Sequence, residues 1–351
     1  MPWHTSLRPV LEEIVQARAV PGLVVAVARG DQAPEHLVVG SDGAGQPLAA
    51  DALFPVASIT KLATALALLR LVAAGSLGLD DSLGRHLPEA VAAIEGVTLR
   101  RLLCHTAGLP IDPPAEAAPY GPALDWPTLA RACLATSPAI PPGTRMSYSN
   151  VGPGLLAVVV ERLTGQRFSA ALGELVVAPL GIEAYLGQEP PRAPARVTGA
   201  LGEHAGTDLE PFNSAFWRSL ALPWGGLVTT AAGALALVRA FAGQPPGFLP
   251  PALRAEATRD QTGGLPGDMM GFLQWPRSPW GLGPDLRGDK APHWAPAEAS
   301  PDSFGHPGAS GTLAWADPAV DVAWSMLGAH TFEAWWASWP AIGAAILAAA
   351  A

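Results

Sequence analysis

The sequence of 351 residues has few charges, few cysteines and no basic stripe. Charged residues make up 15% of the chain and the net charge is −9, so a nucleic-acid partner is not expected. A disulfide needs an oxidising compartment, to which nothing else in the sequence points, so we expect Cys104 and Cys133 to be buried free thiols. There is neither a His-Glu-x-x-His segment nor a cysteine pair at zinc spacing, and no metal or other cofactor is expected.

The sequence also lacks a long apolar segment and a secretion signal. The apolar run over residues 62–74 is too short to cross a bilayer and is followed by Gly75. The first eight residues do not show a basic patch followed by an apolar run. We therefore expect a cytoplasmic protein without a membrane partner, or a periplasmic or secreted one if a leader has been trimmed. The oligomeric state is not indicated.

Apolar residues are abundant, at 49% of the chain, and the length exceeds what one core usually holds, so two lobes are expected. The expected helices span residues 7–19, 58–74, 97–104, 126–135, 152–163, 227–242 and 332–351, and the expected strands span 23–28, 36–40, 312–316 and 320–327. This order predicts an α+β fold with an antiparallel sheet flanked by helices. Residues 1–76 and 221–351 would form the lobe with the sheet, and residues 77–220 an inserted all-helical lobe. The Pro-, Gly- and Trp-rich stretch 243–303 is expected to be a functional rim or a long loop.

The segment Ser58-Ile59-Thr60-Lys61 opens a long apolar helix and is the most informative feature of the chain. Positions three apart share a helix face, so the Ser58 hydroxyl and the Lys61 amine can lie side by side. A serine alcohol is a weak nucleophile without a base beside it, and a buried lysine with a lowered pKa can be that base. The motif alone is weak, because Ser-x-x-Lys also occurs in helices whose lysine is simply solvated.

Two further segments carry chemistry that fits this pair. Tyr148 precedes Asn150 by two residues in a loop, where a tyrosine can shuttle a proton and an asparagine can bind a substrate carbonyl or amide. The segment 306–311 is a Gly-rich approach to an apolar strand, in which the amide of Ala309 or Ser310 could be an oxyanion donor beside that of Ser58. The alternatives are an aromatic anchor with an Asn turn, and a Gly-rich turn that carries a surface His306.

Taken together and in this order, the three segments resemble those of the serine β-lactamase and penicillin-binding-protein superfamily. The Tyr-x-Asn form of the second motif is similar to class C β-lactamases, D-alanyl-D-alanine carboxypeptidases and related carboxylesterases. The resemblance covers nearly the whole chain, and further matching segments are Val20-Pro21-Gly22-Leu23, Leu77-Gly78-Leu79-Asp80-Asp81, Leu102-Leu103-Cys104-His105-Thr106-Ala107-Gly108-Leu109, Trp224-Gly225-Gly226-Leu227, Gly281-Leu282-Gly283 and Phe304-Gly305-His306-Pro307-Gly308.

The resemblance implies a set of site residues. Ser58 would be the acylated nucleophile, Lys61 its activator and Tyr148 the proton relay. The substrate-binding residues implied are Asn150, His306, Gly308 and Ala309. The third motif departs from Lys-Thr-Gly, because His306 and Pro307 replace the cation and the hydroxyl that recognise a substrate carboxylate. A missing charged hydrogen bond costs roughly 1.5–3 kcal/mol, so carboxylated β-lactams and peptides should be poorer substrates than esters.

The function expected from the resemblance is therefore a serine hydrolase of small esters with weak β-lactam turnover. A true β-lactamase, a D-amino-acid peptidase and a catalytically idle binding or scaffold homologue are the alternatives. Among the other candidates, a near match to Gly-x-Ser-x-Gly at 74–78 follows a helix instead of a strand, and His105 is expected to be structural. Six C-terminal tryptophans could line an acyl pocket: Trp275, Trp280, Trp294, Trp335, Trp336 and Trp339. The last three are expected in the core, and Trp280 and Trp294 are the better candidates for contact with the substrate.

Overall fold

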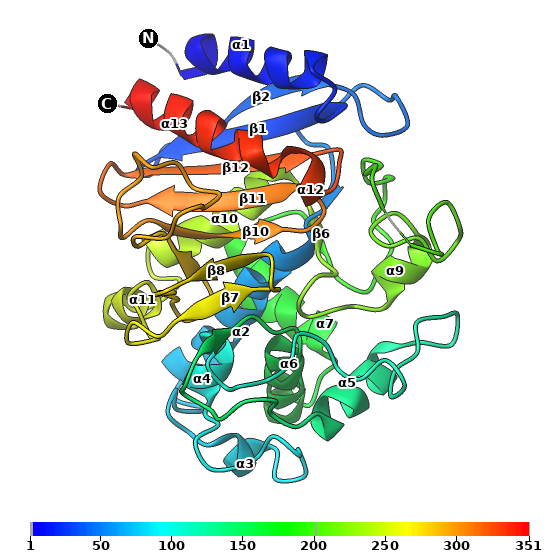
Figure 1. Ribbon diagram of the computed structural model, residues 1–351, viewed down its shortest axis with the longest axis vertical. Coiled ribbons are helices and arrows are strands. Elements are labelled where there is room, and N and C mark those ends of the chain that lie inside the picture. Colours follow the sequence, from blue (N-terminus) through cyan, green and yellow to red (C-terminus); the bar gives the residue numbers. More distant parts are fainter. Residues whose placement is uncertain (1–2, 201, 351) are drawn as a thin grey trace.

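A six-stranded antiparallel sheet, assembled from both ends of the chain, is the centre of the computed structural model, which describes residues 3–200 and 202–350 (Figure 1). The strand order is β2-β1-β12-β11-β10-β9, with β1 (Gly22–Arg29), β2 (Glu35–Gly40), β9 (Asp285–Leu286), β10 (Phe304–Gly308), β11 (Thr312–Asp317) and β12 (Val322–Gly328). Both predicted hairpins are confirmed, β1 with β2 and β11 with β12. The two ends of the chain meet where β1 pairs with β12.

The central strands are buried on both faces, because successive side chains point to opposite sides and helices cover each side. On one side, α1 (Trp3–Gln16) and α13 (Trp339–Ala350) pack against large residues such as Trp324 of β12. On the other side, α10 (Ala231–Ala242) packs against small ones such as Ala323, with α2 (Thr60–Ala73) next to it. The small side chains let α10 approach the sheet closely.

Helix α2 is buried on almost every face, as its apolar sequence predicts. The remaining elements of the chain up to residue 220 are β3 (Phe54–Pro55), η1 (Ala57–Ile59), α3 (Leu83–His86), α4 (Leu99–Leu103), α5 (Trp126–Ala135), β4 (Met146–Ser147), α6 (Val151–Thr164), α7 (Phe168–Leu172), η2 (Gly173–Val177), α8 (Ala178–Leu180), β5 (Ala184–Tyr185) and α9 (Ala215–Ser219). The prediction that 77–220 is all-helical is wrong at β4 and β5, which pair with strands outside it. The division into two lobes at these boundaries stays a prediction.

Three C-terminal segments differ from their predictions. The helix expected from residue 227 starts only at Ala231, because Val228–Thr229 forms strand β6 between β3 and β5, and the Thr230 hydroxyl caps the helix by accepting a hydrogen bond from the Gly233 amide at 3.1 Å. The stretch 243–303 is more ordered than a loop, with α11 (Pro251–Ala257), β7 (Gly267–Met269), β8 (Leu273–Trp275) and β9. The last helix is interrupted, since α12 (Phe332–Trp335) and η3 (Trp336–Ser338) precede α13.

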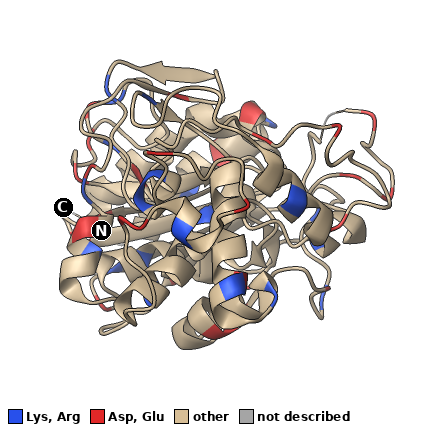
Figure 2. Cartoon of the chain, turned by 90° about the horizontal axis from the view of Figure 1, so that it is seen from below, with Lys and Arg blue, Asp and Glu red and all other residues tan. Residues whose placement is uncertain are grey.

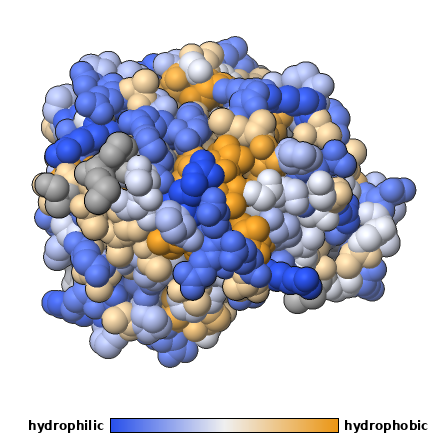
Figure 3. All heavy atoms as spheres, turned by 90° about the horizontal axis from the view of Figure 1, so that it is seen from above, coloured by the Kyte–Doolittle hydropathy of each residue, from blue (hydrophilic) through white to orange (hydrophobic). Residues whose placement is uncertain are grey.

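In the views of Figures 2 and 3 the surface carries mixed charge, and apolar areas lie between hydrophilic ones. Basic and acidic residues are interspersed in Figure 2, without a continuous basic stripe in that view. Figure 3 shows apolar surface confined to narrow areas between hydrophilic ones on the face seen from above. No helix within residues 3–200 and 202–350 is long and apolar enough to cross a membrane. Cys104 and Cys133 are buried free thiols, as predicted.

Candidate active site

Ser58 lies in the short 3₁₀ turn η1 that leads into α2, and several contacts fix this turn. The residue before it, Ala57, has a φ of +45°, a left-handed conformation that costs energy for a residue other than glycine. The Thr60 hydroxyl compensates by donating to the Ala57 carbonyl at 2.6 Å and accepting from the Leu227 amide at 3.0 Å. The turn is thus pinned to the segment before β6, and the Ser58 side chain is left partly exposed.

Lys61 lies beside Ser58, as the three-residue spacing predicts. Its Nζ is 3.2 Å from Ser58 Oγ and donates to Asn150 Oδ1 at 2.7 Å and to the Trp224 carbonyl at 3.0 Å. The residue is only 3% exposed, and burial lowers the pKa of this amine well below its ordinary value, with a smaller opposing effect of Asp112. Because its three direct partners are neutral oxygens, no anion directly holds the proton on the amine, which can therefore act as a base and accept that of Ser58.

Asn150 links this lysine to Asp112, a residue that the sequence analysis missed. The Asn150 Nδ2 donates to Asp112 Oδ1 at 2.7 Å, which turns the amide oxygen of Asn150 toward Lys61. Asp112 lies in the loop after Leu109 and is exposed, and the Asn150 amide donates to the Ile111 carbonyl at 2.6 Å, which holds that loop against the site. No local motif marks Asp112, because the contact spans 38 residues of sequence.

Tyr148 completes the group of predicted catalytic side chains. Lys61 Nζ lies 4.6 Å from the centre of its ring, and its buried hydroxyl has no hydrogen-bond partner in the described part of the chain. Burial raises the pKa of Tyr148, and the nearby Ser58 hydroxyl acts in the opposite direction. Tyr148 is therefore protonated in the resting site and can donate its proton. His105 packs against its ring at 4.7 Å and is buried, as expected for a structural histidine.

His306 does not lie where the sequence analysis placed it. It is neither a surface histidine nor a residue that lines the hollows beside Ser58, because its side chain is fully buried in β10. Its Nδ1 bonds to the Pro307 carbonyl at 2.7 Å, and its ring packs against Tyr148 and Trp280 at 5.9 and 5.7 Å. Burial, together with the nearby Lys61, lowers the pKa of His306 to about 3. A neutral ring supporting Tyr148 replaces the predicted substrate contact.

The end of β10 brings Gly308 and Ala309 beside Ser58. A side chain at Gly308 would meet Thr312 Oγ1 at 2.2 Å and the Val56 carbonyl at 2.3 Å, so only glycine fits between β11 and the nucleophile turn. Among the described residues, the Ala309 amide donates no hydrogen bond, and Ala309 lines the cavity with Ser58. These positions suit an oxyanion hole formed by the amides of Ser58 and Ala309.

Two hollows flank Ser58, and Ser58, Tyr148 and Ala309 line both. The smaller one, about 180 Å³, is also lined by Met269, Met270, Phe272, Trp294, Pro307, Gly308, Phe332 and Glu333. The larger one, about 400 Å³, is lined by apolar residues of the segments around Tyr120, Trp217 and Trp224, with Asn150 and Asp112 as its polar members. If an ester carbonyl lies at Ser58, one of its two substituents, the acyl chain or the alcohol group, would lie in each hollow.

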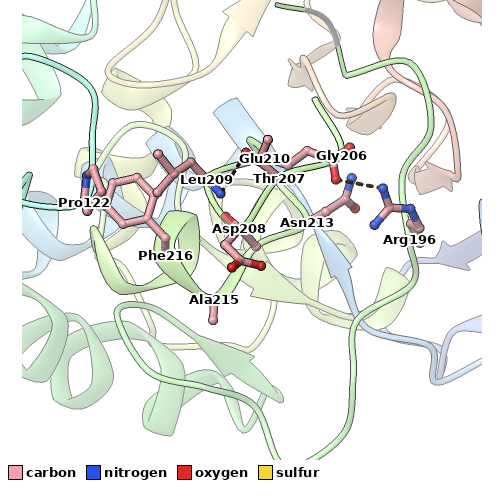
Figure 4. A pocket seen from close by; sticks show the side chains of 11 residues that line it. Pro122, Arg196, Gly206, Thr207, Asp208, Leu209, Glu210, Asn213, Ala215 and Phe216 are labelled. Atoms are coloured by element: carbon pink, nitrogen blue, oxygen red, sulfur yellow. Dashed lines mark hydrogen bonds and ion pairs between the residues drawn. The ribbon is translucent and has the colours of Figure 1, made fainter. Parts of the chain in front are cut away.

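A wider hollow, shown in Figure 4, lies apart from these residues. It measures about 800 Å³, is lined by residues 206–210 and 213–216, and contains the ion pair of Arg196 with Glu210 at 2.7 Å. None of the predicted catalytic residues lines it. Phe212 and Trp217, next to these residues in the sequence, line the larger hollow at Ser58.

A second buried polar cluster, Asp285–Lys290–His293, was also missed by the sequence analysis. Lys290 Nζ pairs with Asp285 Oδ1 and donates to the Pro279 carbonyl at 2.8 Å, and His293 Nε2 lies 2.9 Å from Asp285 Oδ2. Burial raises the pKa of Asp285, but the charges of Lys290 and His293 outweigh it and leave the pKa below its usual value. Burial lowers the pKa of His293 to about 4. The Lys290 ammonium also lies over the rings of Trp275 and Trp280, and the cluster thereby supports the aromatic wall behind Tyr148.

The tryptophans are divided differently from the prediction. Trp280 and Trp294 are both fully buried, not exposed at a rim as predicted; Trp294 borders the smaller hollow, whereas Trp280 lies behind Tyr148 and lines neither hollow. Trp335 and Trp339 are in the core as expected, but Trp336 is only half-buried and packs against Phe272 and Phe332 at the rim of the smaller hollow.

A serine, a buried lysine and a buried tyrosine that converge at the end of an antiparallel sheet define a serine hydrolase, and the comparisons with known proteins agree. The chain belongs to the beta-lactamase family, whose model matches residues 7–334. It is 31% identical to the esterase EstB of Burkholderia gladioli over 88% of this chain and 83% of that protein. It is 34% identical to penicillin-binding protein 4 of Amycolatopsis lactamdurans, over 63% of this chain and 59% of that protein.

The solved structures of similar fold include a beta-lactamase from Mycobacterium bovis and EstCE1, a hydrolase with promiscuous acyltransferase activity. The first is 28% identical, with a TM-score of 0.68 and coverage of 97% of this chain and 99% of that one. EstCE1 is 22% identical, with a TM-score of 0.78 and 98% coverage of both chains, and shows the fold alone.

Proposed function

We propose that this protein hydrolyses small carboxylic esters through an acyl-enzyme on Ser58. The observation that carries the proposal is the position of Lys61, whose buried Nζ lies 3.2 Å from Ser58 Oγ and contacts no carboxylate directly. A lysine in this environment can be neutral and serve as the general base, and the resemblance of 88% of the chain to the esterase EstB supports the ester as substrate.

In the proposed acylation step, Lys61 takes the proton of Ser58 as Oγ attacks the ester carbonyl. The amides of Ser58 and Ala309 stabilise the oxyanion of the tetrahedral intermediate. The intermediate collapses as the bond to the alkoxide breaks, and the Tyr148 hydroxyl gives that oxygen its proton. Lys61, 4.6 Å from the Tyr148 ring, returns a proton to the tyrosine. Deacylation repeats the sequence with water in place of Ser58, and both side chains return to their starting states.

Esters are favoured over carboxylated β-lactams by the lining of the two hollows. Neither contains Lys or Arg among the described residues, and the imidazole of His306 is buried and neutral. A carboxylate would find no cation to compensate for the water it loses. The second candidate is hydrolysis of β-lactams or D-amino-acid peptides, which the match to penicillin-binding protein 4 favours, and the third is an idle homologue.

A paired kinetic assay tests the proposal. We expect fast cleavage of p-nitrophenyl butyrate, weak turnover of nitrocefin, and loss of both in Ser58→Ala. Nitrocefin turnover above ester cleavage would favour the β-lactamase. Activity that survives in Ser58→Ala would contradict the assignment of the nucleophile. A fluorophosphonate that adds no mass to Ser58, together with no turnover, would favour the idle homologue.

A further inference from the structure

The smaller hollow beside Ser58 combines aromatic faces with a carboxylate. Tyr148, Phe272, Trp294 and Phe332 supply the aromatic part of its lining, and Met269 and Met270 add further apolar groups. Glu333 is its only charged lining residue among those the structure describes, and it is exposed at the beginning of α12. Aromatic rings with a carboxylate nearby are the chemistry that recognises ammonium groups.

The size of this hollow suits one compact group. Its volume is about 180 Å³. An apolar cavity of about 150 Å³ holds a benzene ring, so a trimethylammonium or tert-butyl group would fit with a short linker. Phe272 and Phe332 meet edge to face at 5.6 Å, and Trp336 packs against both of them, which fixes the rings at the rim. Aromatic rings in mutual contact therefore form the rim of this hollow.

The charged side chains that line the two hollows beside Ser58 are acidic. The only charged residue that lines the larger hollow among the described residues is Asp112, which is also acidic. Lys61 lines neither hollow, and its amine is occupied by Ser58 Oγ, Asn150 Oδ1 and the Trp224 carbonyl. The lining would thus attract a positive group and repel a negative one.

We propose that the smaller hollow binds a cationic group of the substrate. The protein then prefers esters that bear an ammonium group over neutral esters of the same shape, and it prefers the neutral esters over anionic ones. This inference rests on the proposed ester hydrolysis at Ser58. It adds Glu333 as the residue that determines the charge preference, with the surrounding rings as the site that holds the cation.

The first test compares two pairs of esters, in which a trimethylammonium group replaces a tert-butyl group of the same shape. Choline butyrate and 3,3-dimethylbutyl butyrate carry it on the alcohol side, and ethyl 4-(trimethylammonio)butanoate and ethyl 5,5-dimethylhexanoate on the acyl side. Hydrolysis is measured by the protons that it releases. In the pair whose charged end enters the hollow, we expect kcat/KM to be about tenfold higher for the cationic ester than for the neutral one. The ratio should fall at least about threefold in Glu333→Gln and stay unchanged in the control Glu95→Gln, whose exposed side chain lies outside both hollows.

A ratio of one or less in both pairs, or a ratio that Glu333→Gln does not change, would overturn the inference while leaving ester hydrolysis intact. Binding of phenyltrimethylammonium to the Ser58→Ala protein, measured by calorimetry, tests the same hollow without turnover. We expect binding that weakens at least about threefold in the Ser58→Ala/Glu333→Gln protein. Absence of binding counts against the hollow, whereas binding without turnover of any ester in the wild type would contradict only the proposed reaction.

Discussion

Lys61 and Lys290 are the only lysines in the sequence, and both are buried, but their partners give them opposite properties. Among the residues that the structure describes, Lys61 hydrogen-bonds only to neutral oxygens, and burial lowers its pKa well below the ordinary value. Burial lowers the pKa of Lys290 as well, but the directly paired carboxylate of Asp285 opposes the shift. A lysine without an anion is suited to proton transfer, whereas a lysine paired with one is suited to holding structure.

This difference explains why one lysine is positioned beside a nucleophile and the other behind the aromatic wall. Lys290 supports Trp275 and Trp280, and Trp280 packs on Tyr148. The charged cluster thus fixes the ring that Lys61 approaches from the other side. An anion beside Lys61 would keep its amine protonated and remove the base, whereas loss of the anion beside Lys290 would weaken the packing of the aromatic wall.

The largest expected effect is on activity, in Lys61→Met. Loss of the general base should lower kcat/KM for a p-nitrophenyl ester by about 10³-fold or more, because positioned acid–base catalysis contributes roughly 10²–10⁴-fold. The free energy of unfolding should change by at most about 2 kcal/mol, since only neutral acceptors lose their donor. Steady-state kinetics and urea denaturation check both values. An unfolded variant, or one with near-normal turnover, would contradict the role of Lys61.

The matching variant Lys290→Met should lose stability before it loses chemistry. Removing the cation leaves Asp285 buried without its main partner, which costs about 3–5 kcal/mol of unfolding free energy. The double variant Lys290→Met/Asp285→Asn should recover part of this loss, because the unpaired charge is then gone. Urea denaturation of the three proteins checks the prediction. A neutral effect of Lys290→Met would show that the pair does not support the wall.

Acid should destabilise the protein through its buried histidines, because burial lowers the pKa of His105 as well as those of His306 and His293. The pKa values of His306 and His293 fall from about 6.5 when unfolded to about 3 and about 4 when folded, so below pH 6.5 the unfolded chain binds more protons. Stability is therefore complete above pH 6.5 and falls toward pH 4, by up to about 1.4 kcal/mol per pH unit for each histidine. Urea denaturation between pH 7 and 5 measures this slope largely before carboxylates titrate. Stability that stays constant or increases over this window as the pH falls would contradict the buried, neutral state of these rings.

The smallest expected effect concerns Asp112→Asn. The substitution keeps an acceptor for Asn150 Nδ2 but removes the charge that raises the pKa of Lys61. Lys61 should then lose its proton at lower pH, and the acid limb of the kcat/KM profile should move to lower pH with a change in the maximum of less than about tenfold. A shift to higher pH, or no shift, would show that Asp112 does not act on the base.

The sequence predicted the parts of this account that depend on local patterns. The strand pair β1 and β2, helix α5 at 126–135 and the hairpin of β11 and β12 follow from periodicity and turn residues. Ser58 and Lys61 follow from helical spacing, and Tyr148 and Asn150 from the order of the motifs. The elements and the placement of Lys61 beside Ser58 agree with the structure because nearby residues determine both the element and the direction of the side chain, while the catalytic roles stay predictions.

What could not be predicted depends on contacts between distant parts of the chain. Strands β7 and β8 have only three residues each, and β7 pairs with β4, about 120 residues away. Asp112 acquires its role only where its loop meets Asn150, and the burial of His306 depends on the packing of Trp280 and Tyr148 around it. The Asp285–Lys290–His293 cluster has no sequence pattern that distinguishes it from a surface ion pair.

The measurement that tests the central claim most directly is a pH titration of the two lysines by NMR. With ¹³C-labelled lysine the protein should give two side-chain Cε signals, and the Lys61→Arg variant assigns them. The account predicts that the Lys61 signal titrates well below the ordinary lysine range, whereas the Lys290 amine, paired with Asp285, keeps its proton to higher pH. A Lys61 amine that stays protonated as long as that of Lys290 would contradict its assignment as the base.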